Sequence, residues 1–293
     1  MTQLFKGAGV ALVTPFKTDF SIDYTALEMI IEEQIAGGMD YLVALGTTAE
    51  TPTLGTEEAK EVVSFIKSKV NKRVPLLLGM GGNDPMKVID TIKKTDFTDI
   101  AGILSVTPYY NRPSQAGLIE YYKLVAKACP VPVVLYNVPS RTGVNMEAMT
   151  SITIARSCPN VVAVKEASGE SSQVARMVKH APDHFAVISG DDVLALPVIA
   201  VGGIGVISVI ANALPQQLAR LVHLCNEGKF NEALPLHLKL VDMLKLVFRE
   251  GNPTGVKALL EIMGKSTGVV RLPLAKASTE LYKDLETELK TII

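Results

Sequence analysis

The sequence predicts an α/β fold: a (β/α)8 TIM barrel followed by a C-terminal helical extension. Eight short segments rich in Val, Ile and Leu recur between residues 7 and 212. Amphipathic segments with helical spacing separate them. A doubly wound open sheet is the alternative, but the Gly-x-Gly-x-x-Gly turn that would come after its first strand is missing.

The predicted strands carry apolar residues on both faces, which is typical of parallel strands covered on both sides. Eight such strands with their connections span about 225 residues, the usual size of a (β/α)8 barrel. The predicted strands are residues 7–16, 41–48, 74–81, 100–108, 131–139, 161–168, 185–192 and 204–212.

Helical periodicity fills the gaps between these strands. Residues 24–38 repeat apolar side chains at intervals of three and four, and end in Gly37 and Gly38, which is typical of a helix end. Residues 56–71 open with Thr56 as the expected N-cap and with an acidic first turn, which the helix dipole favours.

The last part of the chain has a different pattern. Residues 229–293 predict three helices and no strand, with a break at residues 252–255. We therefore expect a catalytic barrel over residues 1–226 and a helical appendage, without a core of its own, over residues 227–293.

The composition excludes several classes of protein. The 293 residues are 48% hydrophobic, enough for a sizeable core, and the net charge of −1 leaves no basic footprint for nucleic acid or membrane. No run of 18 apolar residues predicts a membrane span. The N-terminal segment "MTQLFKGAGV" is too short and too weakly apolar for a signal peptide.

The cysteines and histidines indicate neither a disulfide scaffold nor a metal site. An odd and sparse set of three cysteines is typical of reduced thiols in a cytoplasmic protein. The histidines have no Cys or carboxylate partners at metal-ligand spacing, so we expect no metal and no other cofactor. These residues are Cys129, Cys158 and Cys225, and His180, His184, His223 and His237.

In a barrel of this kind the chemistry lies at the C-terminal ends of the strands. The predicted strand ends carry hydroxyl, phenol, amide and charged groups. They are Thr47 and Thr48, Tyr109 to Arg112, Tyr136, Asn137 and Arg141, Lys165 and Glu166, and Ser189 to Asp192.

Lys165 is the most unusual of these residues, because it ends an apolar strand. Side-chain alternation places Val161, Ala163 and Lys165 on one face, and Val134 and Tyr136 on one face of the preceding strand. If both faces point inward, an amine and a phenol meet inside the barrel. Burial favours the neutral amine, which attacks a carbonyl to form a Schiff base. The structural alternative is a lysine that reaches the solvent.

Five segments occur together in one order: "GTTAE" (46–50), "PYYNRPS" (108–114), "YNVPSRTG" (136–143), "VKEASG" (164–169) and "SGDD" (189–192). With these segments the chain resembles the dihydrodipicolinate synthase family, within the wider superfamily of pyruvate-dependent aldolases. The resemblance runs from about residue 5 to the C-terminal segments "NPTGVK" (252–257) and "RLPL" (271–274).

The resemblance implies a reaction and a set of roles. Lys165 would form a Schiff base with pyruvate, and the resulting enamine would attack L-aspartate 4-semialdehyde to give 4-hydroxy-tetrahydrodipicolinate in diaminopimelate and lysine biosynthesis. The implied proton relay is Thr47, Tyr136 and Tyr110, with Tyr110 lent across the dimer interface of a homotetramer. The implied substrate-binding residues are Thr48 for the pyruvate carboxylate, Arg141 for the semialdehyde carboxylate, and Gly190 and Ile207 along the pocket.

One residue departs from the family pattern, which usually has Gly where this chain has Ala49. If that position needs a positive φ, alanine costs about 1 kcal/mol. Two alternatives stay open. Another pyruvate-dependent lyase, acting on N-acetylneuraminate or a keto-deoxy sugar acid, would keep Lys165 and Tyr136 without needing Arg141. A non-catalytic barrel that binds a keto acid is the other.

The resemblance also bears on inhibition by lysine, the end product of the pathway in many relatives. Enteric-type relatives bind lysine in a pocket across the dimer interface that includes a His and a Glu. This chain keeps Asn83 and Tyr109 of that pattern, but has Ala59 at the His position and Lys87 at the Glu position.

We predict that L-lysine inhibits this protein weakly or not at all. Lys87 turns an attraction for the cationic effector into a repulsion, and two charges 4 Å apart interact by about 1 kcal/mol in water and about 4 kcal/mol at an intermediate dielectric. The affinity should fall at least about tenfold. A titration of activity with L-lysine measures it. Half-inhibition below millimolar lysine would mean that Glu57 or Glu58 supplies the missing carboxylate.

Overall fold

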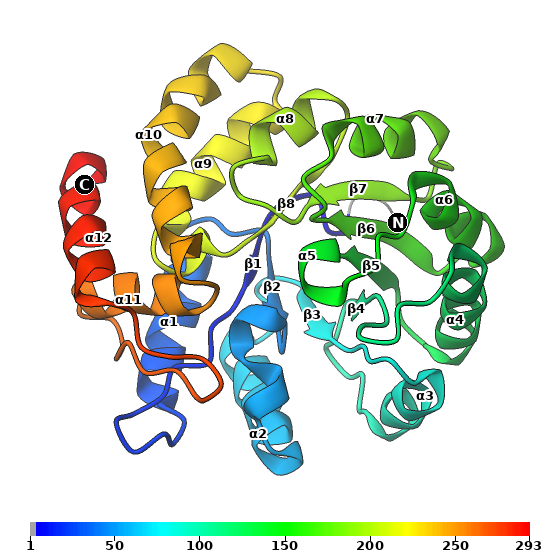
Figure 1. Cartoon of the computed structure of the whole chain (residues 1–293), viewed down its shortest axis with the longest axis horizontal. Coiled ribbons are helices and arrows are strands. Elements are labelled where there is room, and N and C mark those ends of the chain that lie inside the picture. Colours follow the sequence, from blue (N-terminus) through cyan, green and yellow to red (C-terminus); the bar gives the residue numbers. More distant parts are fainter. Residues whose placement is uncertain (1–3) are drawn as a thin grey trace.

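The strands close into a barrel in the order β1 to β8, all parallel (Figure 1). The computed structural model describes residues 4–293. The first three residues of the segment "MTQLFKGAGV", for which no signal peptide is expected, lie outside the described residues. The strands are β1 (Gly7–Ala11), β2 (Tyr41–Ala44), β3 (Leu76–Gly79), β4 (Gly102–Val106), β5 (Val133–Asn137), β6 (Val161–Glu166), β7 (Ala186–Ser189) and β8 (Gly205–Ser208). The predicted fold is confirmed, and each strand lies within its predicted segment.

Helices form a ring outside the strands (Figure 1). They are α1 (Tyr24–Ala36), α2 (Thr56–Val70), α3 (Pro85–Lys94), α4 (Gln115–Ala128), α5 (Pro139–Thr142), α6 (Ala148–Ser157), α7 (Ser171–His180), α8 (Ala195–Ala200) and α9 (Pro215–Asn226). Short 3-10 turns are η1 (Thr47–Ala49), η2 (Thr51–Thr53) and η3 (Ile210–Asn212).

The predicted end of the first helix is confirmed, and the predicted start of the second is wrong by one residue. α1 ends at Ala36 with Gly37 as its C-cap, and Gly38 takes the left-handed conformation that a helix end favours. The N-cap of α2 is Gly55, and Thr56 is the first helical residue. The reason is Glu58, whose carboxylate turns back to accept the Gly55 N–H at 2.9 Å and satisfies a free donor at the helix start.

The core has two layers, because strand side chains alternate between the barrel interior and the surrounding helices. The outer layer includes Val133, Leu135 and Val164, which pack with residues of the helices. The interior contains Tyr41, Val43, Leu77, Leu104, Val134, Tyr136, Ala163, Ile188 and Ile207.

The pairing of β5 and β6 contains an irregularity that corrects one prediction. Val133 pairs with Val161, but the next residue, Val134, pairs with Ala163. Val162 is therefore an extra residue, and it joins Ala163 in the interior while Val161 packs in the outer layer. Val161 does not share a face with Lys165, as simple alternation predicted.

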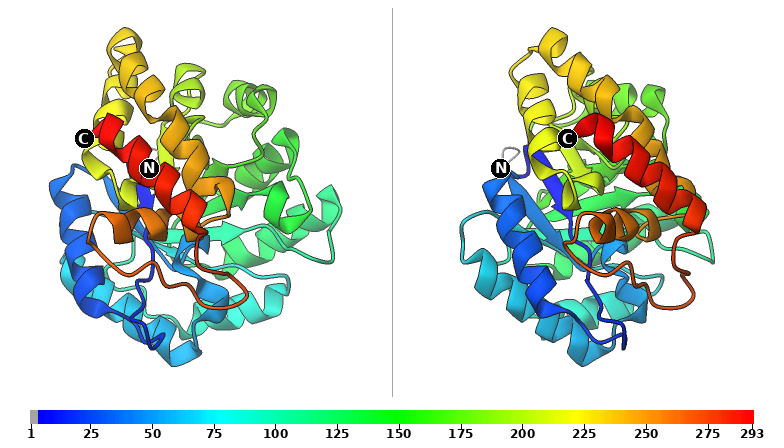
Figure 2. Two further views of the ribbon diagram at one scale, coloured as in Figure 1. Left: turned by 60° about the vertical axis from the view of Figure 1, so that its left-hand side comes forward. Right: turned by 90° about the vertical axis from the view of Figure 1, so that its left-hand side faces the viewer.

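Three helices come after the barrel: α10 (Phe230–Arg249), α11 (Thr254–Ile262) and α12 (Thr279–Ile292). α10 packs on α8 and α9, and α11 lies against η3. α12 lies over α10 and α11 (Figure 2). We propose residue 226 as the boundary between the catalytic barrel and the C-terminal helical appendage. Within residues 4–293 no helix has the length and apolar character needed to cross a membrane.

Candidate active site

Lys165 and Tyr136 lie opposite each other on neighbouring strands. Tyr136 of β5 pairs with Lys165 of β6, and the lysine Nζ is 4.5 Å from the centre of the tyrosine ring. Both side chains are buried, at 4% and 7% exposure. Among residues 4–293 the Lys165 amine has no carboxylate within ion-pair distance. An amine with an aromatic neighbour and no carboxylate partner is free to react as a nucleophile once it loses its proton.

Two further predicted residues are Gly190, which lies against the Lys165 side chain, and Ile207, which lies in the barrel interior. A Cβ on Gly190 would lie 3.1 Å from Lys165 Cγ and 2.6 Å from Ala167 Cβ, so only a glycine leaves the lysine stem its place. The Gly190 N–H donates to Glu166 O at 2.7 Å. Ile207 of β8 is fully buried in the barrel interior.

Asp191 comes directly after Gly190 and interacts electrostatically with Lys165. Burial raises the pKa of the Asp191 carboxyl group, and the positive charge of Lys165 opposes this rise. The loop after β7 therefore brings both a close backbone approach and an acidic group towards the lysine.

Thr47 and Thr48 lie in η1, shortly after β2. Thr48 is 2% exposed, and its Oγ1 accepts a hydrogen bond from Asn252 Nδ2 at 3.0 Å. Ala49 is buried in the same turn, with its carbonyl bound by Thr14 Oγ1 at 2.8 Å. Ala49 does not have a positive φ, so the cost anticipated from the sequence does not arise; the left-handed residue is Glu50, at φ 56°.

Arg141 reaches the same asparagine from α5. It is largely exposed, and its Nη2 donates to Asn252 O at 3.3 Å. Asn252 therefore contacts Thr48 with its side chain and Arg141 with its backbone. The sequence patterns gave this residue no role: "NPTG" indicated a break before a helix, and "NPTGVK" extended the family resemblance.

The three residues of the proposed relay are not connected by hydrogen bonds within one chain. Tyr110 is 90% exposed and has a positive φ of 75°, a strained conformation for an aromatic residue. Arg112, in the same loop, donates to Gly143 O at 2.8 Å and ties the loop to the end of α5. The loop thus presents the Tyr110 phenol to the outside, while Lys165 of the same chain is buried.

Behind the Lys165–Tyr136 pair lies a polar network to which the sequence patterns assigned no role. Asn137 and Glu166 come directly after Tyr136 and Lys165, and they pair in the same register. Asn137 Nδ2 donates to Glu166 Oε2 at 3.0 Å, and Gln173 Nε2 donates to the same oxygen at 3.1 Å. The bond between Asn137 and Glu166 crosses from β5 to β6 and holds Tyr136 opposite Lys165.

At the predicted effector position, the Asn83 side chain and both alternative carboxylates already have partners within the chain. Asn83 Nδ2 donates to Tyr109 O at 3.4 Å, and Lys87 is exposed on α3. Of the alternative carboxylates, Glu57 pairs with Lys60 at 2.7 Å. Arg271 binds Glu58 and holds the pKa of its carboxyl group at about 2. Both carboxylates thus have a cation of their own.

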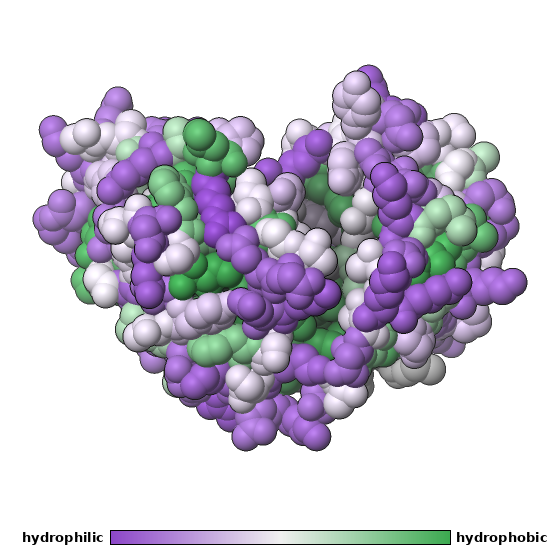
Figure 3. All heavy atoms as spheres, turned by 90° about the horizontal axis from the view of Figure 1, so that it is seen from below, coloured by the Kyte–Doolittle hydropathy of each residue, from purple (hydrophilic) through white to green (hydrophobic). Residues whose placement is uncertain are grey.

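The surface is hollowed between two raised flanks, and apolar residues are visible within the hollow (Figure 3). A separate pocket of about 450 Å³ lies between α10 and α12, where Asp242, Arg249 and Asp284 line it. None of the strand-end residues lines that pocket, so it is not the candidate active site. Among residues 4–293, no group of three or more His, Cys, Asp and Glu side chains could hold a metal ion.

A buried lysine against a tyrosine at the strand ends of a (β/α)8 barrel fits a lyase that forms a Schiff base. Comparison with known proteins makes the class specific. Residues 4–292 match the model of the dihydrodipicolinate synthetase family, and the chain belongs to this family.

Relatives named 4-hydroxy-tetrahydrodipicolinate synthase cover nearly the whole chain. The one from Parabacteroides distasonis is 47% identical over 287 residues, 98% of this chain and 97% of its own length. The one from Flavobacterium psychrophilum is 46% identical over 284 residues, 97% of each chain.

Solved structures agree. Dihydrodipicolinate synthase from Aquifex aeolicus superposes with a TM-score of 0.94 at 38% identity, over 98% of this chain and 97% of that one. A structure described as the first monomeric dihydrodipicolinate synthase variant has a TM-score of 0.96 at 37% identity, over 99% and 98%.

Proposed function

We propose that this chain condenses pyruvate with L-aspartate 4-semialdehyde through a Schiff base on Lys165, giving 4-hydroxy-tetrahydrodipicolinate for diaminopimelate and lysine biosynthesis. The observation that carries the proposal is the buried Lys165 amine, 4.5 Å from the Tyr136 ring at the end of β6. Family membership over residues 4–292 supports the substrates. The three free, buried cysteines fit a reducing compartment, and we propose the cytoplasm.

In the proposed reaction the neutral Lys165 amine attacks the ketone carbon of pyruvate, and water leaves to give an iminium ion. Loss of a methyl proton gives the enamine, whose carbon attacks the aldehyde carbon and forms the new carbon–carbon bond. The amino group of the semialdehyde then attacks the iminium carbon, closes the ring and releases Lys165. The chain itself supplies the nucleophile, and no cofactor is needed.

The other predicted residues fit binding and proton transfer. Thr48 is proposed to bind the pyruvate carboxylate and Arg141 the semialdehyde carboxylate, where a planar guanidinium suits two oxygens. Gly190 and Ile207 are proposed to line the pyruvate pocket. Thr47, Tyr136 and Tyr110 are proposed to move protons, with the exposed Tyr110 entering the site of a second subunit in a homotetramer built from dimers.

Replacement of the nucleophile is the most direct test. Lys165→Ala should abolish the pyruvate adduct trapped by borohydride, and should lower kcat by several orders of magnitude because covalent catalysis is lost. Mass spectrometry of the reduced protein measures the adduct. Lys60→Ala, at an exposed lysine, should keep both adduct and activity. Near-normal turnover by a folded Lys165→Ala protein would reject the mechanism, and absence of a wild-type adduct would favour the binding-only barrel.

The second substrate is tested at Arg141. Charged hydrogen bonds contribute about 1.5–3 kcal/mol, so Arg141→Ala should lower kcat/KM for the semialdehyde roughly 10- to 150-fold. Pyruvate trapping should survive. Arg176→Ala, at an exposed arginine of α7, is the control. Loss of trapping together with semialdehyde use would make Arg141 structural. Preference for N-acetylneuraminate or a keto-deoxy sugar acid would favour the other lyases.

The lending of Tyr110 is tested by mixing two inactive variants. In a hybrid of Tyr110→Phe and Lys165→Ala subunits, one site has its own Lys165 and receives an intact Tyr110 from the other subunit. Mixing should therefore restore part of the activity that each variant alone lacks. Sedimentation of the active wild type should show a dimer or tetramer. A fully active monomer, or hybrids without restored activity, would contradict the shared relay.

A further inference from the structure

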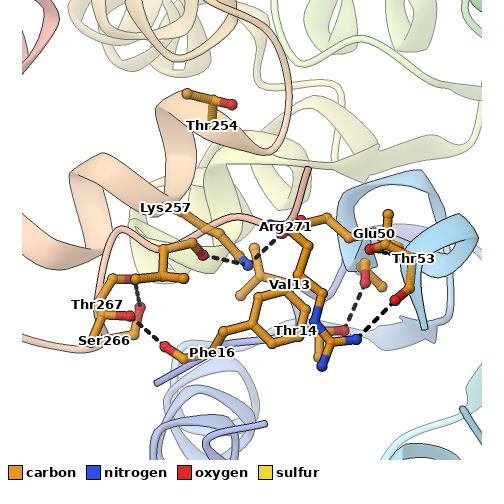
Figure 4. A network of polar contacts seen from close by, with 12 residues as sticks. Val13, Thr14, Phe16, Glu50, Thr53, Thr254, Lys257, Ser266, Thr267 and Arg271 are labelled. Atoms are coloured by element: carbon orange, nitrogen blue, oxygen red, sulfur yellow. Dashed lines mark hydrogen bonds and ion pairs between the residues drawn. The ribbon is translucent and has the colours of Figure 1, made fainter. Parts of the chain in front are cut away.

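A buried ion pair lies outside the residues proposed to bind or convert the substrates. Lys257 of α11 binds Glu50, and their side chains are 0% and 1% exposed (Figure 4). The two residues come from distant parts of the chain, since Glu50 comes after η1 in the barrel and Lys257 belongs to the C-terminal helices. Neither is used by the proposed reaction.

Glu50 occupies a constrained position in the backbone. It ends η1 and begins η2, and its φ of 56° and ψ of 35° lie in the left-handed region, which is unfavourable for a residue with a side chain. Both carboxylate oxygens are bound. Oε1 accepts from Lys257 Nζ, and Oε2 accepts the backbone N–H of Arg271 at 2.8 Å. Two segments of the C-terminal extension thus hold this turn in its unusual conformation.

Glu50 and Lys257 form a cluster with Phe16 and Arg271. Its Nζ also donates to Val269 O at 3.0 Å and lies 4.1 Å from the centre of the Phe16 ring. Arg271 lies over the same ring, and its Nη1 donates to both Thr53 O and Glu58 at 2.8 Å. Burial lowers the pKa of Lys257 to about 8, and the negative charge of Glu50 opposes this shift.

The cluster reaches Thr48 by two routes. Through the backbone, Glu50 comes after Thr48 and Ala49 in the same turn. Through α11, Lys257 lies one turn after the N-terminus of the helix, and its N–H donates to Pro253 O at 2.9 Å. Asn252, just before that turn, donates to Thr48 Oγ1. Movement at the ion pair would shift Thr48 from both sides.

We infer that Glu50 and Lys257 are positioning residues that set the Thr47–Thr48 turn in the shape that receives the pyruvate carboxylate. The inference rests on the proposed function. It makes the C-terminal extension part of the pyruvate site rather than a separate appendage. A purely stabilising role explains the pair less well, because a buried ion pair often contributes no more stability than apolar side chains of the same size.

The test compares two matched double variants. Glu50→Gln with Lys257→Met removes both charges and keeps the side-chain sizes, so no unpaired charge is left buried. Glu33→Gln with Lys265→Met removes another ion pair, of 2.6 Å, that also ties the extension to the barrel but does not touch η1. Thermal unfolding and circular dichroism report whether each protein folds.

The main measurement is the pyruvate concentration that gives half-maximal borohydride trapping, together with KM for each substrate. In the Glu50/Lys257 variant we expect the half-trapping concentration and the KM for pyruvate to rise about 10- to 100-fold, as a misplaced binding group would cause. The KM for the semialdehyde should change much less. The Glu33/Lys265 variant should keep wild-type values for both substrates.

Four outcomes would overturn the inference. A folded Glu50/Lys257 variant with wild-type dependence on pyruvate would make the pair structural only. Equal effects on both substrates, or equal effects of the two double variants, would do the same. If the Glu50/Lys257 variant does not fold, Glu50→Asp keeps the negative charge but is one methylene shorter, so its carboxylate cannot reach both Lys257 Nζ and the Arg271 N–H as that of Glu50 does. An unchanged pyruvate KM in that folded protein overturns the inference. Failure of wild-type trapping would instead reject the proposed function itself.

Discussion

The register between β5 and β6 is the constraint on which the site depends. It places Tyr136 opposite Lys165 in the interior, and it places Asn137 opposite Glu166 on the other face. The amine is kept in an apolar layer on one side, while a hydrogen-bonded carboxylate on the other side fixes the two strands. A slip of one residue would exchange these faces, and the carboxylate would replace the amine inside the barrel. The extra residue at Val162 lies before this point, so the register is reset just ahead of the site.

Local sequence patterns were enough to predict the strands and to select the residues at their C-terminal ends. Apolar runs indicated the eight strands, and the rule that chemistry lies at strand ends selected Lys165, Tyr136 and Thr48. Contacts between residues distant in the chain were not predictable in this way. Glu50 and Lys257 are 207 positions apart, and no sequence spacing indicates that they form a pair. The bulge at Val162 was missed because alternation assumes that paired strands advance together.

Two parts of the molecule therefore contribute to the proposed substrate pocket. The barrel contributes the amine proposed to react, on β6, and the residues proposed to line the pocket, Gly190 and Ile207. The C-terminal extension approaches the residues proposed to bind carboxylates, since Asn252 contacts both Thr48 and Arg141. This arrangement argues against treating residues 227–293 as an independent domain. The extension packs on α8 and α9, and its buried lysine has its only carboxylate partner, among the described residues, in the barrel.

The alanine that departs from the family pattern fits the same view. Ala49 lies in η1 with a 3-10 backbone, and the left-handed conformation falls on the next residue, Glu50. A glycine at residue 50 would accept this conformation without strain, but it would have no carboxylate for Lys257 and Arg271. Glu50 adopts the unfavourable left-handed conformation, and two donors from the C-terminal extension bind its carboxylate and hold it there. The turn that carries Thr47 and Thr48 is thus held in part by long-range contacts, and these contacts are made by Glu50 rather than by Ala49.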